Sequence, residues 1–324
     1  MAKEIKSIGV LTSGGDAPGM NAAVRAIVRA GITKGYRMIG VQRGYNGLIN
    51  GECYEMNVRS VSEIIHRGGT ILYTARCLEF KTREGQAKGV ARCKELGIDA
   101  LVVIGGDGSF MGARALSNQG IPCIGIPGTI DNDIACSEYT IGYDTAMNTA
   151  VEAIDKLRDT TQSHDRCSVV EVMGHHAGYI ALNVGIATGA LAVLLPERPF
   201  DFERDILERM RQTQATGNKH FIIIVPEGVI SAQDLANQIQ AATGVDSRAT
   251  VLGHIQRGGS PTVRDRVNAS LMGYHAIDLL DRGIYNRVVA VSGGKIVDYD
   301  VNVALSMHKT IDDSEIEVAN SISI

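Results

Sequence analysis

Tryptophan is absent from this chain of 324 residues, and aromatic residues of all kinds make up only 5% of it. Proteins that bind single-stranded nucleic acid stack bases on aromatic side chains, so this scarcity argues against that function. The formal net charge of −4 also gives no excess of positive charge for DNA, RNA or anionic lipid. We therefore expect no nucleic-acid partner and no membrane partner, and any anion site must come from locally placed arginines.

Long apolar runs are also missing. Segments such as Ala190–Leu195 and Phe221–Val225 are far too short to cross a bilayer. Charged residues interrupt the first six positions, so we expect no secretory signal and a cytoplasmic protein. The six cysteines form no Cys-x-x-Cys pair and no cluster at metal-ligand spacing, which predicts reduced thiols used mostly in packing.

Short apolar segments alternate with amphipathic segments of helical length along the whole chain. The apolar segments predict strands at Ile8–Leu11, Met38–Val41, Leu101–Ile104, Cys123–Ile126, Ser168–Val172, Leu191–Leu195, Phe221–Val225, Thr250–Leu252 and Val288–Val291. The segments between them predict helices at Asn21–Lys34, Gly85–Glu95, Met147–Arg158, Phe202–Gln214, Ala232–Ala242 and Val267–Leu280. Apolar strands that are each followed by a helix indicate parallel sheets covered on both faces. The sequence therefore predicts a doubly wound α/β protein that binds its ligands at the carboxyl ends of the strands.

The first predicted strand leads into a glycine-rich segment, Thr12–Asn21, and then into a helix. Glycines let the backbone approach an anion closely, and the unpaired N–H groups at the start of a helix attract one. The spacing of Gly14 and Gly19 is similar to that of a P-loop, but Met20-Asn21 stands where Lys-Ser/Thr is required. Two interpretations stay open, a phosphate-binding loop and a tight turn before a helix.

A second glycine-rich segment, Gly105–Ser109, follows the strand predicted at Leu101–Ile104. Its Asp107 lies between glycines just past a buried strand, where a carboxylate can hold Mg²⁺ and the glycines leave room for a polyphosphate. The structural alternative is that Asp107 is the N-cap of the helix after Ser109.

A third segment, Pro127–Asp133, reads Pro-Gly-Thr-Ile-Asp-Asn-Asp. If it is extended, Asp131 and Asp133 share one face, so that one could act as a base while the other helps to organise a metal. An Asx-turn is the structural alternative. Three such strand ends in one chain are much less easily explained as coincidence than any one of them.

Two further runs, Glu171–Gly174 and Arg248–Gly259, complete a pattern. Over essentially its whole length, the chain resembles the bacterial ATP-dependent 6-phosphofructokinases. The most specific matches are Pro127–Asp133 and the Gly-His-Ile-Gln-Arg-Gly-Gly of Gly253–Gly259. The Gly-Asp-Gly motif alone is weak, because a similar one occurs in lipid kinases and NAD kinases.

The resemblance implies a fold and an assembly. The expected phosphofructokinase fold has two doubly wound, Rossmann-like three-layer α/β/α domains. Residues 1–141 plus 256–306 would form the large ATP-binding domain, and 142–255 plus 307–324 the smaller domain that binds fructose 6-phosphate. The resemblance also implies a homotetramer.

The resemblance further implies roles for individual residues, with Asp131 as the general base and Asp107 as the ligand of Mg²⁺. The residues implied around ATP are Gly15, Tyr45, Arg76, Cys77, Gly106, Asp107, Gly108 and Ser109. Those implied around fructose 6-phosphate are Thr129, Ile130, Asp131, Arg166, Met173, Gly174, His175, Glu227, Arg248, His254 and Arg257. The catalytic set implied is Asp131, Thr129, Arg76 and Arg166. Arg166 and Arg248 would come from a neighbouring subunit, and an effector site would use Arg25, Arg29, Arg59, Arg158 and His220.

The identity of the phosphoryl donor follows from two glycines. Relatives that use pyrophosphate carry an aspartate at the position of Gly108 and a lysine at that of Gly128. A carboxylate at position 108 would crowd and repel the α-phosphate of ATP, whereas glycine leaves that volume open. The sequence therefore favours ATP as the donor.

The chain departs from the family pattern in two places. His175 stands where the family has arginine, and a partly charged histidine cannot form the same paired hydrogen bonds, so we expect weaker and pH-sensitive binding of phosphate-bearing ligands. In the effector site, Val58, Thr216 and Asn218 replace basic residues and Leu191 replaces a metal-binding glutamate. Fewer cations predict weak or absent control by ADP or phosphoenolpyruvate.

Three other functions stay open at this stage. They are a pyrophosphate-dependent phosphofructokinase, a catalytically silent sensor of nucleotide or sugar phosphate, and a lipid or NAD kinase. The two glycines oppose the first function, and a retained base at Asp131 opposes the second. The third leaves the specific motifs at Pro127–Asp133 and Gly253–Gly259 without an explanation.

Overall fold

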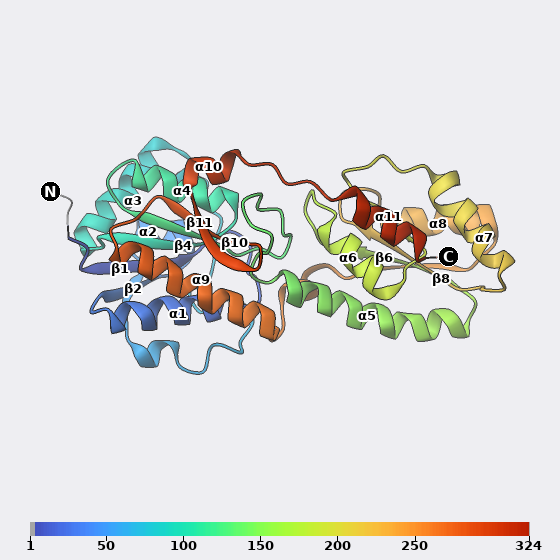
Figure 1. The fold of residues 1–324 in the computed structure, drawn as a ribbon, viewed down its shortest axis with the longest axis horizontal. Coiled ribbons are helices and arrows are strands. Elements are labelled where there is room, and N and C mark those ends of the chain that lie inside the picture. The colour runs from blue at the N-terminus through green and yellow to red at the C-terminus, as the bar shows by residue number, and fades with distance from the viewer. Residues whose placement is uncertain (1–3, 324) are drawn as a thin grey trace. The chain divides into compact units, whose positions relative to one another are not determined.

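Ser7–Thr12 forms a strand, β1, that is buried along its whole length. In the computed structural model, which describes residues 4–323, β1 is an inner strand of a seven-stranded sheet with the order β11-β10-β5-β4-β1-β2-β3 (Figure 1). The other strands are Arg37–Val41 (β2), Cys53–Met56 (β3), Ala100–Gly105 (β4), Cys123–Pro127 (β5), Arg287–Ser292 (β10) and Lys295–Asp300 (β11). The five inner strands run parallel, and β3 and β11 pair antiparallel at the two edges.

Helices cover both faces of this sheet. They are Met20–Thr33 (α1), Gly44–Asn50 (α2), Arg83–Leu96 (α3), Asp107–Ser117 (α4), Val263–Asp281 (α9) and Val301–Ser306 (α10), with 3₁₀ turns at Val58–Val61 (η1) and Glu79–Lys81 (η2). Helices α1 and α9 lie side by side on one face (Figure 1). They approach closely at Gly273, where an added Cβ would lie 2.9 Å from the Ala23 carbonyl oxygen. On the opposite face, α2, α3 and α4 enclose an apolar core that includes Leu48, Cys93 and Leu116.

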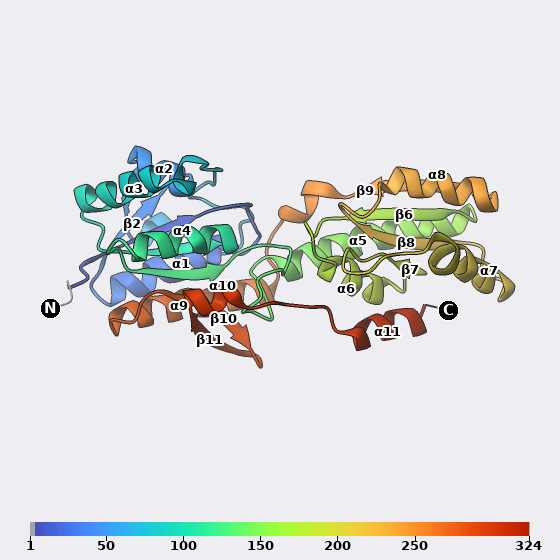
Figure 2. The same cartoon turned by 90° about the horizontal axis from the view of Figure 1, so that it is seen from above.

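A second, smaller sheet has the order β7-β8-β6-β9, with all four strands parallel. Its strands are Cys167–Val172 (β6), Ala192–Val193 (β7), Phe221–Pro226 (β8) and Ser247–Val251 (β9). The helices are Tyr143–Ser163 (α5), Tyr179–Thr188 (α6), Glu208–Ala215 (α7), Ala232–Thr243 (α8) and Asp313–Ser321 (α11), with a π-helical turn at Glu203–Leu207 (η3) and a 3₁₀ helix at Gly253–Arg257 (η4) (Figure 2). Residues of β6, β8, α7 and α8 form its core, among them Val169, Ile223 and Leu235.

The chain separates into two compact units, each built on one sheet. The first contains residues 1–130, 134–145 and 257–309, and the second contains 131–133, 146–256 and 310–324. The sequence-based division placed the crossings at 141/142, 255/256 and 306/307. The structure instead groups residues 142–145 with the first unit and Asp131–Asp133 with the second.

The predicted α/β class is confirmed, but several strand assignments are corrected. The strand predicted at Thr250–Leu252 begins three residues earlier, at Ser247, because this edge strand is only partly buried and lacks a continuous apolar run. The strand predicted at Leu191–Leu195 is reduced to Ala192–Val193. Strands β3 and β11 escape the sequence pattern for the same reason as β9, since most of their residues are partly exposed. No helix within the described residues is both long and apolar enough to cross a membrane.

Candidate active site

Three glycine-rich segments leave the large sheet at the same edge, at the carboxyl ends of β1, β4 and β5. The register pairs Thr12 with Ile104 and Gly105 with Pro127. Hydrogen bonds continue beyond the strands: the Ser13 N–H donates to the Ile104 carbonyl at 2.9 Å, and the Gly128 N–H donates to the Gly105 carbonyl at 3.0 Å. Parallel pairing therefore brings together three segments that follow different strands of the chain, the first of them more than 80 residues before the other two.

Two helices begin at this edge without a side-chain cap. The N-caps of α1 and α4 are Gly19 and Gly106, and neither end has a side-chain cap hydrogen bond. Elsewhere in the described chain, α3, α8, α9, α10 and α11 are capped by Thr, Ser or Asp side chains, whereas α2, α6 and α7 have no side-chain cap either. Uncapped N–H groups at a helix start attract anions, and at α1 and α4 they lie at neighbouring strand ends, which favours a phosphate site over a simple turn in the first segment.

Asn21, which stands where a P-loop carries serine or threonine, connects the first segment to residues 67–71. Its side chain donates to the carbonyls of Arg67 and Gly68 and accepts from the Ile71 N–H at 2.8 Å. The Thr74 hydroxyl donates to the Gly14 carbonyl at 2.6 Å. These bonds fasten the segment that carries the exposed Arg76 to the first glycine-rich loop.

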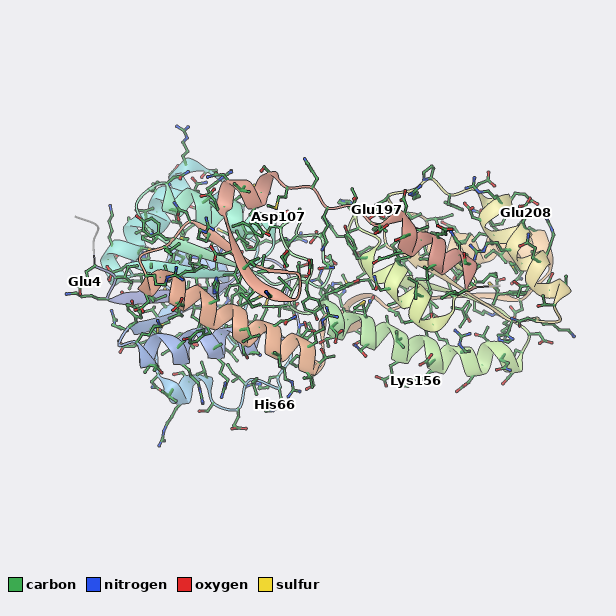
Figure 3. All side chains as sticks on the ribbon, in the orientation of Figure 1. Glu4, His66, Asp107, Lys156, Glu197 and Glu208 are labelled. Atoms are coloured by element: carbon green, nitrogen blue, oxygen red, sulfur yellow. The ribbon has the colours of Figure 1, made fainter. Side chains whose placement is uncertain are left out.

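Asp107 is the first residue of α4 and is exposed (Figure 3). Because Gly106 is the N-cap, the alternative in which the Asp107 side chain caps the helix does not hold. No atom lies within 4 Å of the position of a Cβ added at Gly108, so the space beside Asp107 is open. The described residues contain no cluster of three or more His, Cys, Asp or Glu side chains. One exposed carboxylate beside an open loop fits Mg²⁺, which commonly binds through one or two carboxylates together with substrate phosphates and water.

Gly128, unlike Gly108, has other side chains packed closely against it. An added Cβ there would lie 2.9 Å from a methyl carbon of Ile104 and 3.1 Å from the terminal carbon of Met20. A lysine at 128 would therefore have to displace core side chains. The open-volume argument about the donor applies to position 108 and not to position 128.

Tyr45 lies in the core behind the Gly106–Ser109 loop, and Cys77 is partly buried beside that core. The Tyr45 hydroxyl donates to the Ser109 carbonyl at 2.6 Å, and its ring stacks on Phe80 at 4.1 Å. Burial raises the pKa of Tyr45 well above its usual value. Cys77 packs against the same apolar cluster. Within this structure Tyr45 supports the Gly106–Ser109 loop through its hydrogen bond to the backbone.

The segment Thr129–Asp133 turns sharply, so the expectation of an extended run is wrong. Asn132 has a φ of 52°, in the left-handed region that asparagine tolerates better than most residues. Asp131 and Asp133 therefore do not share a face as alternate residues of a strand would. Asp131 is 7% exposed and Asp133 is partly buried, so the two carboxylates have different surroundings.

In the second unit, Glu227 holds the turn that follows β6. Its carboxylate accepts hydrogen bonds from the N–H groups of Gly174 and His175, at 3.2 and 2.9 Å. Gly174 and His175 have φ values of 154° and 57°. Glu227 thus brings three predicted sugar-site positions together at the carboxyl ends of β6 and β8, and the His175 side chain is exposed there.

Arg166 and Arg248 lie at the opposite side of the same sheet, at the amino ends of β6 and β9. Both pair with Asp246: Arg166 Nε lies 2.6 Å from Asp246 Oδ2, and Arg248 Nη2 lies 3.1 Å from Oδ1. The hydrogen bond from Arg166 is the largest cause of a lowered pKa at Asp246. Arg166 directly precedes β6, so the length of that strand, roughly 20 Å, separates it from the turn after β6.

Two predicted sugar-site residues lie in η4, the 3₁₀ helix that follows β9. His254 is exposed in η4. Arg257 lies against the first glycine-rich loop: its Nη1 donates to the Asp16 carbonyl at 3.3 Å, and a Cβ at Gly15 would collide with its guanidinium. A side chain at position 15 would therefore displace the Arg257 guanidinium from this position.

The five predicted effector residues are divided between the two units. Arg25 and Arg29 are partly buried on α1, and Arg59 is exposed in η1. In the second unit, Arg158 on α5 donates to the Thr188 carbonyl. His220 directly precedes β8, and its N–H donates to the Asn218 side chain at 3.2 Å.

Comparisons with known proteins agree with this arrangement. The sequence model of the family described as Phosphofructokinase matches residues 7–280. Relatives in Clostridium botulinum strain Hall and Clostridium perfringens strain 13 are each 53% identical over 319 residues, which are 98% of this chain and the full length of each relative. This chain belongs to the phosphofructokinase family. The two relatives are called "ATP-dependent 6-phosphofructokinase" and "ATP-dependent 6-phosphofructokinase 1".

Solved phosphofructokinase structures have the same fold. The Saccharomyces cerevisiae enzyme matches with a TM-score of 0.88 and 33% identity, and the Pichia pastoris enzyme with 0.89 and 34%. This chain spans 48% and 37% of those longer chains. A pyrophosphate-dependent phosphofructokinase from Marinobacter aquaeolei matches with a TM-score of 0.86 at 21% identity, which shows the shared fold alone.

Sequence reasoning missed one buried carboxylate of this phosphofructokinase. Asp265 is fully buried and accepts hydrogen bonds from the Tyr139 hydroxyl, the Gly142 N–H, and both the N–H and hydroxyl of Thr145. Burial raises the pKa of Asp265. The clamped segment is bonded to the Thr129–Asp133 turn, because the Thr140 hydroxyl donates to the Thr129 carbonyl at 2.7 Å. The N-cap pattern Thr262-x-x-Asp265 was visible in the sequence, but it did not show where the carboxylate points.

Proposed function

We propose that this chain is an ATP-dependent 6-phosphofructokinase. It transfers the γ-phosphoryl group of ATP to the C1 hydroxyl of fructose 6-phosphate and forms fructose 1,6-bisphosphate and ADP. The observation that carries the proposal is the convergence of the β1, β4 and β5 ends, which brings the Asp107 loop and the start of the Thr129–Asp133 turn to one edge. The 53% identity to relatives with that name supports it.

The chemistry depends on positioning and on charge neutralisation. The uncapped starts of α1 and α4 and the guanidinium of Arg76 would bind the ATP phosphates. Asp107 would hold Mg²⁺, which supplies positive charge to the phosphates when bound. Asp131 would accept the proton of the C1 hydroxyl as that oxygen attacks, a role typically worth about 10²–10⁴-fold. Thr129 would orient the hydroxyl.

ATP rather than pyrophosphate is the proposed donor. The open space beside Gly108 supports it, since an aspartate side chain there would lie in the volume left for the α-phosphate. A silent sensor would need neither the carboxylate of Asp131 nor the buried clamp at Asp265. The relatives' printed names favour the same choice.

The sugar site requires a second copy of the chain. Within one chain, Arg166 and Arg248 lie at the amino ends of β6 and β9, whereas Glu227 and the Met173–His175 turn lie at the carboxyl ends. The proposal is that the two arginines bind fructose 6-phosphate in a neighbouring subunit of a homotetramer, where His254 and Arg257 complete the site. The protein would work in the cytoplasm.

Hybrid assemblies test the shared site. Asp131→Asn and Arg166→Ala variants, each nearly inactive alone, should regain activity when co-assembled, because some sites then combine two intact contributions. Asp131→Asn mixed with Asp107→Asn is the matched control and should regain none, since both groups come from one chain. Equal recovery, or none, in the two mixtures would contradict the shared site.

We propose that ADP and phosphoenolpyruvate control the activity of this protein only weakly. Arg25, Arg29, Arg59, Arg158 and His220 remain, but Leu191 is an apolar residue 5% exposed where a metal-binding carboxylate would be needed. A strongly sigmoidal fructose 6-phosphate curve relieved by ADP would overturn this.

The exposed His175 is expected to make KM for phosphate-bearing substrates pH-dependent. An unchanged pH profile of KM in His175→Gln would contradict that role.

The decisive test is formation of fructose 1,6-bisphosphate by the purified protein with Mg²⁺, fructose 6-phosphate and either ATP or pyrophosphate. We expect turnover with ATP alone. Turnover with pyrophosphate would refute the donor argument. No turnover with either donor would favour the silent sensor.

A further inference from the structure

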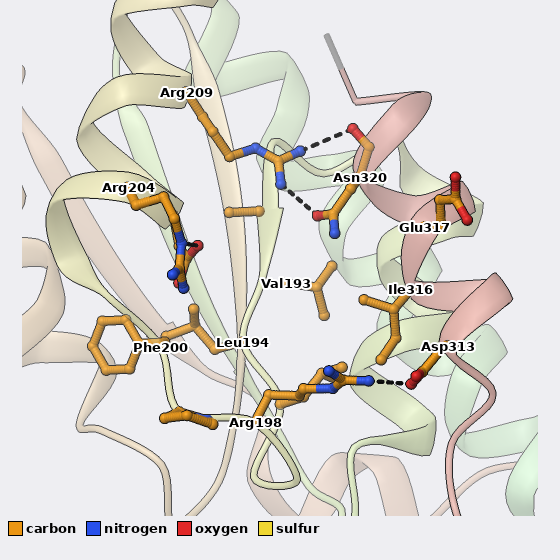
Figure 4. Close-up of a pocket in the computed structure, with 14 residues that line it drawn as sticks. Val193, Leu194, Arg198, Phe200, Arg204, Arg209, Asp313, Ile316, Glu317 and Asn320 are labelled. Carbon is orange, nitrogen blue, oxygen red and sulfur yellow. Dashed lines mark hydrogen bonds and ion pairs between the residues drawn. The ribbon is translucent and has the colours of Figure 1, made fainter.

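The second unit contains a cavity of about 480 Å³ that none of the predicted site residues lines. The cavity lies between β7 with the segment that follows it, the helical stretch of η3 and α7, and the carboxy-terminal helix α11 (Figure 4). Its volume falls within the range of about 300–1,000 Å³ that small-molecule sites occupy. We propose that this cavity binds a small amphipathic anion, a carboxylate or phosphate group carried on an apolar body.

The apolar part of the site comes from three directions. Val193 and Leu194 contribute from β7 and the residue after it, Phe200 from the following segment, and Ile316 from α11 (Figure 4). Leu194 is 2% exposed, and Phe200 packs against the core of this unit. This wall is already ordered, so an apolar ligand body would need little rearrangement to bury its surface.

Most of the charged groups around the cavity are paired with one another. Arg198 forms an ion pair with Asp313, and Arg204 Nε lies 2.7 Å from Asp205 Oδ1. Glu317 is exposed on α11, and its carboxylate points away from the cavity (Figure 4). These groups leave little uncompensated charge for a ligand.

Arg209 differs from them, because it forms no ion pair within the described residues. Its guanidinium donates to neutral oxygens: Nη1 to the Asn320 side chain at 2.5 Å, and Nη2 to the Asn320 carbonyl at 3.3 Å and to the Ser323 hydroxyl. A guanidinium has five N–H donors, so two are left. An anion in the cavity could accept them.

The electrostatic setting of Arg209 favours such a ligand. Burial lowers the pKa of Arg209, and the nearby charge of Asp205 opposes that effect only in part. The Asp205 carboxylate accepts hydrogen bonds from Arg204, so it neutralises little of the positive charge of Arg209. A half-buried guanidinium without a bonded carboxylate is stabilised when an anion binds it with charge-assisted hydrogen bonds.

Helix α11 gives a route into the cavity. None of its residues is buried, and arginines hold it at both ends, through Arg198 with Asp313 and Arg209 with Asn320. Elements with little buried apolar surface open at a low free-energy cost. A ligand could therefore enter by local displacement of α11 without unfolding the sheet.

Methyl NMR of the full-length protein tests the site with defined probes. Phenyl phosphate and benzoate supply the two anion types on one apolar body, benzyl alcohol is the neutral analogue, and inorganic phosphate lacks the apolar body. Phenyl phosphate or benzoate should cause saturable shifts at the methyl groups of Ile316 and Leu194. Benzyl alcohol should bind at least about tenfold more weakly, since a charged hydrogen bond contributes about 1.5–3 kcal/mol. Inorganic phosphate should also bind at least about tenfold more weakly, because it buries no apolar surface.

Two α7 variants separate the role of Arg209 from a general effect of charge. Arg209→Gln should weaken binding at least about tenfold, whereas Arg211→Gln should not, because Arg211 pairs with Glu203 outside the cavity. Arg209→Lys keeps the charge and should bind measurably even if Arg209→Gln disturbs α11. Phe200→Ala should weaken phenyl phosphate binding without changing that of inorganic phosphate.

Several outcomes would overturn the proposal. These are absence of saturable shifts at Ile316 and Leu194, equal affinity in Arg209→Gln and Arg211→Gln, and equal affinity for benzyl alcohol and benzoate. Inorganic phosphate that binds as tightly as phenyl phosphate would refute the amphipathic class. All of these readouts are independent of kinase activity, so failure of this proposal can be distinguished from failure of the proposed function.

Discussion

The two sheets of this protein organise their functional residues in different ways. The large sheet gathers its glycine-rich segments at one edge and connects them by hydrogen bonds such as Ser13 to Ile104 and Gly128 to Gly105. The small sheet divides its candidate residues between both edges, with Glu227 at the carboxyl ends and Arg166 at the amino ends. Under the proposed function, the first arrangement would bind a nucleotide within one chain, whereas the second would need residues of another chain.

The difference has a physical origin in strand direction. Parallel strands present their carboxyl ends together, so residues just after β1, β4 and β5 converge without a partner. A residue just before a strand lies on the far side of the sheet and can act only at another surface. Arg166 is such a residue, and Arg248 lies close to it as the second residue of β9. Both form ion pairs with Asp246, which directly precedes β9.

Asp131→Asn should give the largest effect of any single substitution. The amide preserves the volume of this buried side chain but cannot accept the hydroxyl proton, so kcat should fall by about 10²–10⁴-fold. Steady-state kinetics with ATP measures it, and KM for ATP should change little. A kcat within threefold of the wild type would remove Asp131 from the role of base.

Gly108→Asp tests whether the large sheet alone selects the donor. The carboxylate would face the α-phosphate, and like-charge proximity costs several kcal/mol, so kcat/KM for ATP should fall by about a hundredfold. Gly108→Ala is the matched control and should stay near wild type, because its Cβ meets no atom within 4 Å. Equal kinetics in the two variants would refute the argument from charge and volume.

Asp265→Asn tests whether the clamp on residues 139–145 positions the catalytic loop. An amide NH₂ would face N–H donors, which should cost about 1–3 kcal/mol of stability and lower kcat about tenfold. KM for ATP should be unchanged, because the Asp107 loop lies on other elements. Asp278→Asn, on the surface of the same helix, is the control. Lost stability with unchanged kcat would make Asp265 purely structural.

Asp298, near the edge of the large sheet, should give the smallest effect. Burial opposes ionisation, but hydrogen bonds from His275 and Arg287 outweigh it and hold the pKa of Asp298 below its usual value. A lowered folded pKa adds stability that is present above about pH 4 and is lost as the pH falls through the folded pKa.

The measurement is the urea midpoint of wild type and Asp298→Asn between pH 3 and 6. The difference between them should shrink as the pH falls below about 4. Lys295→Gln on the same strand should show no such convergence. A difference that is constant with pH would contradict the assignment to Asp298.

Much of the fold could be predicted because buried parallel strands leave a strong local signal. Ile8–Leu11, Leu101–Ile104 and Cys123–Ile126 are continuous apolar runs, and each is a central strand of the structure. Edge strands β3 and β11 lack such runs, since one side of each faces solvent. Periodicity therefore detects the centre of a sheet better than its margins.

The candidate site was predictable where backbone chemistry forms it. The glycines at 14, 19 and 106 indicate close approach and uncapped helix starts, and the structure places two of them as N-caps. The turn at Asn132 was not predictable from alternation, because its φ of 52° depends on packing around the segment. Gly128 likewise looked equivalent to Gly108 until Ile104 and Met20 were found against it.

By itself, the sequence determined the α/β class, the three glycine-rich strand ends of the candidate site, and the family, because each is encoded by short runs of neighbouring residues. Only the tertiary structure decided that Tyr45 supports the Gly106–Ser109 loop from behind, that Asp265 clamps the residues beside Thr129, and that Arg166 lies a strand's length from Glu227. Those relations join residues distant in the chain, and strand order, helix packing and burial set them.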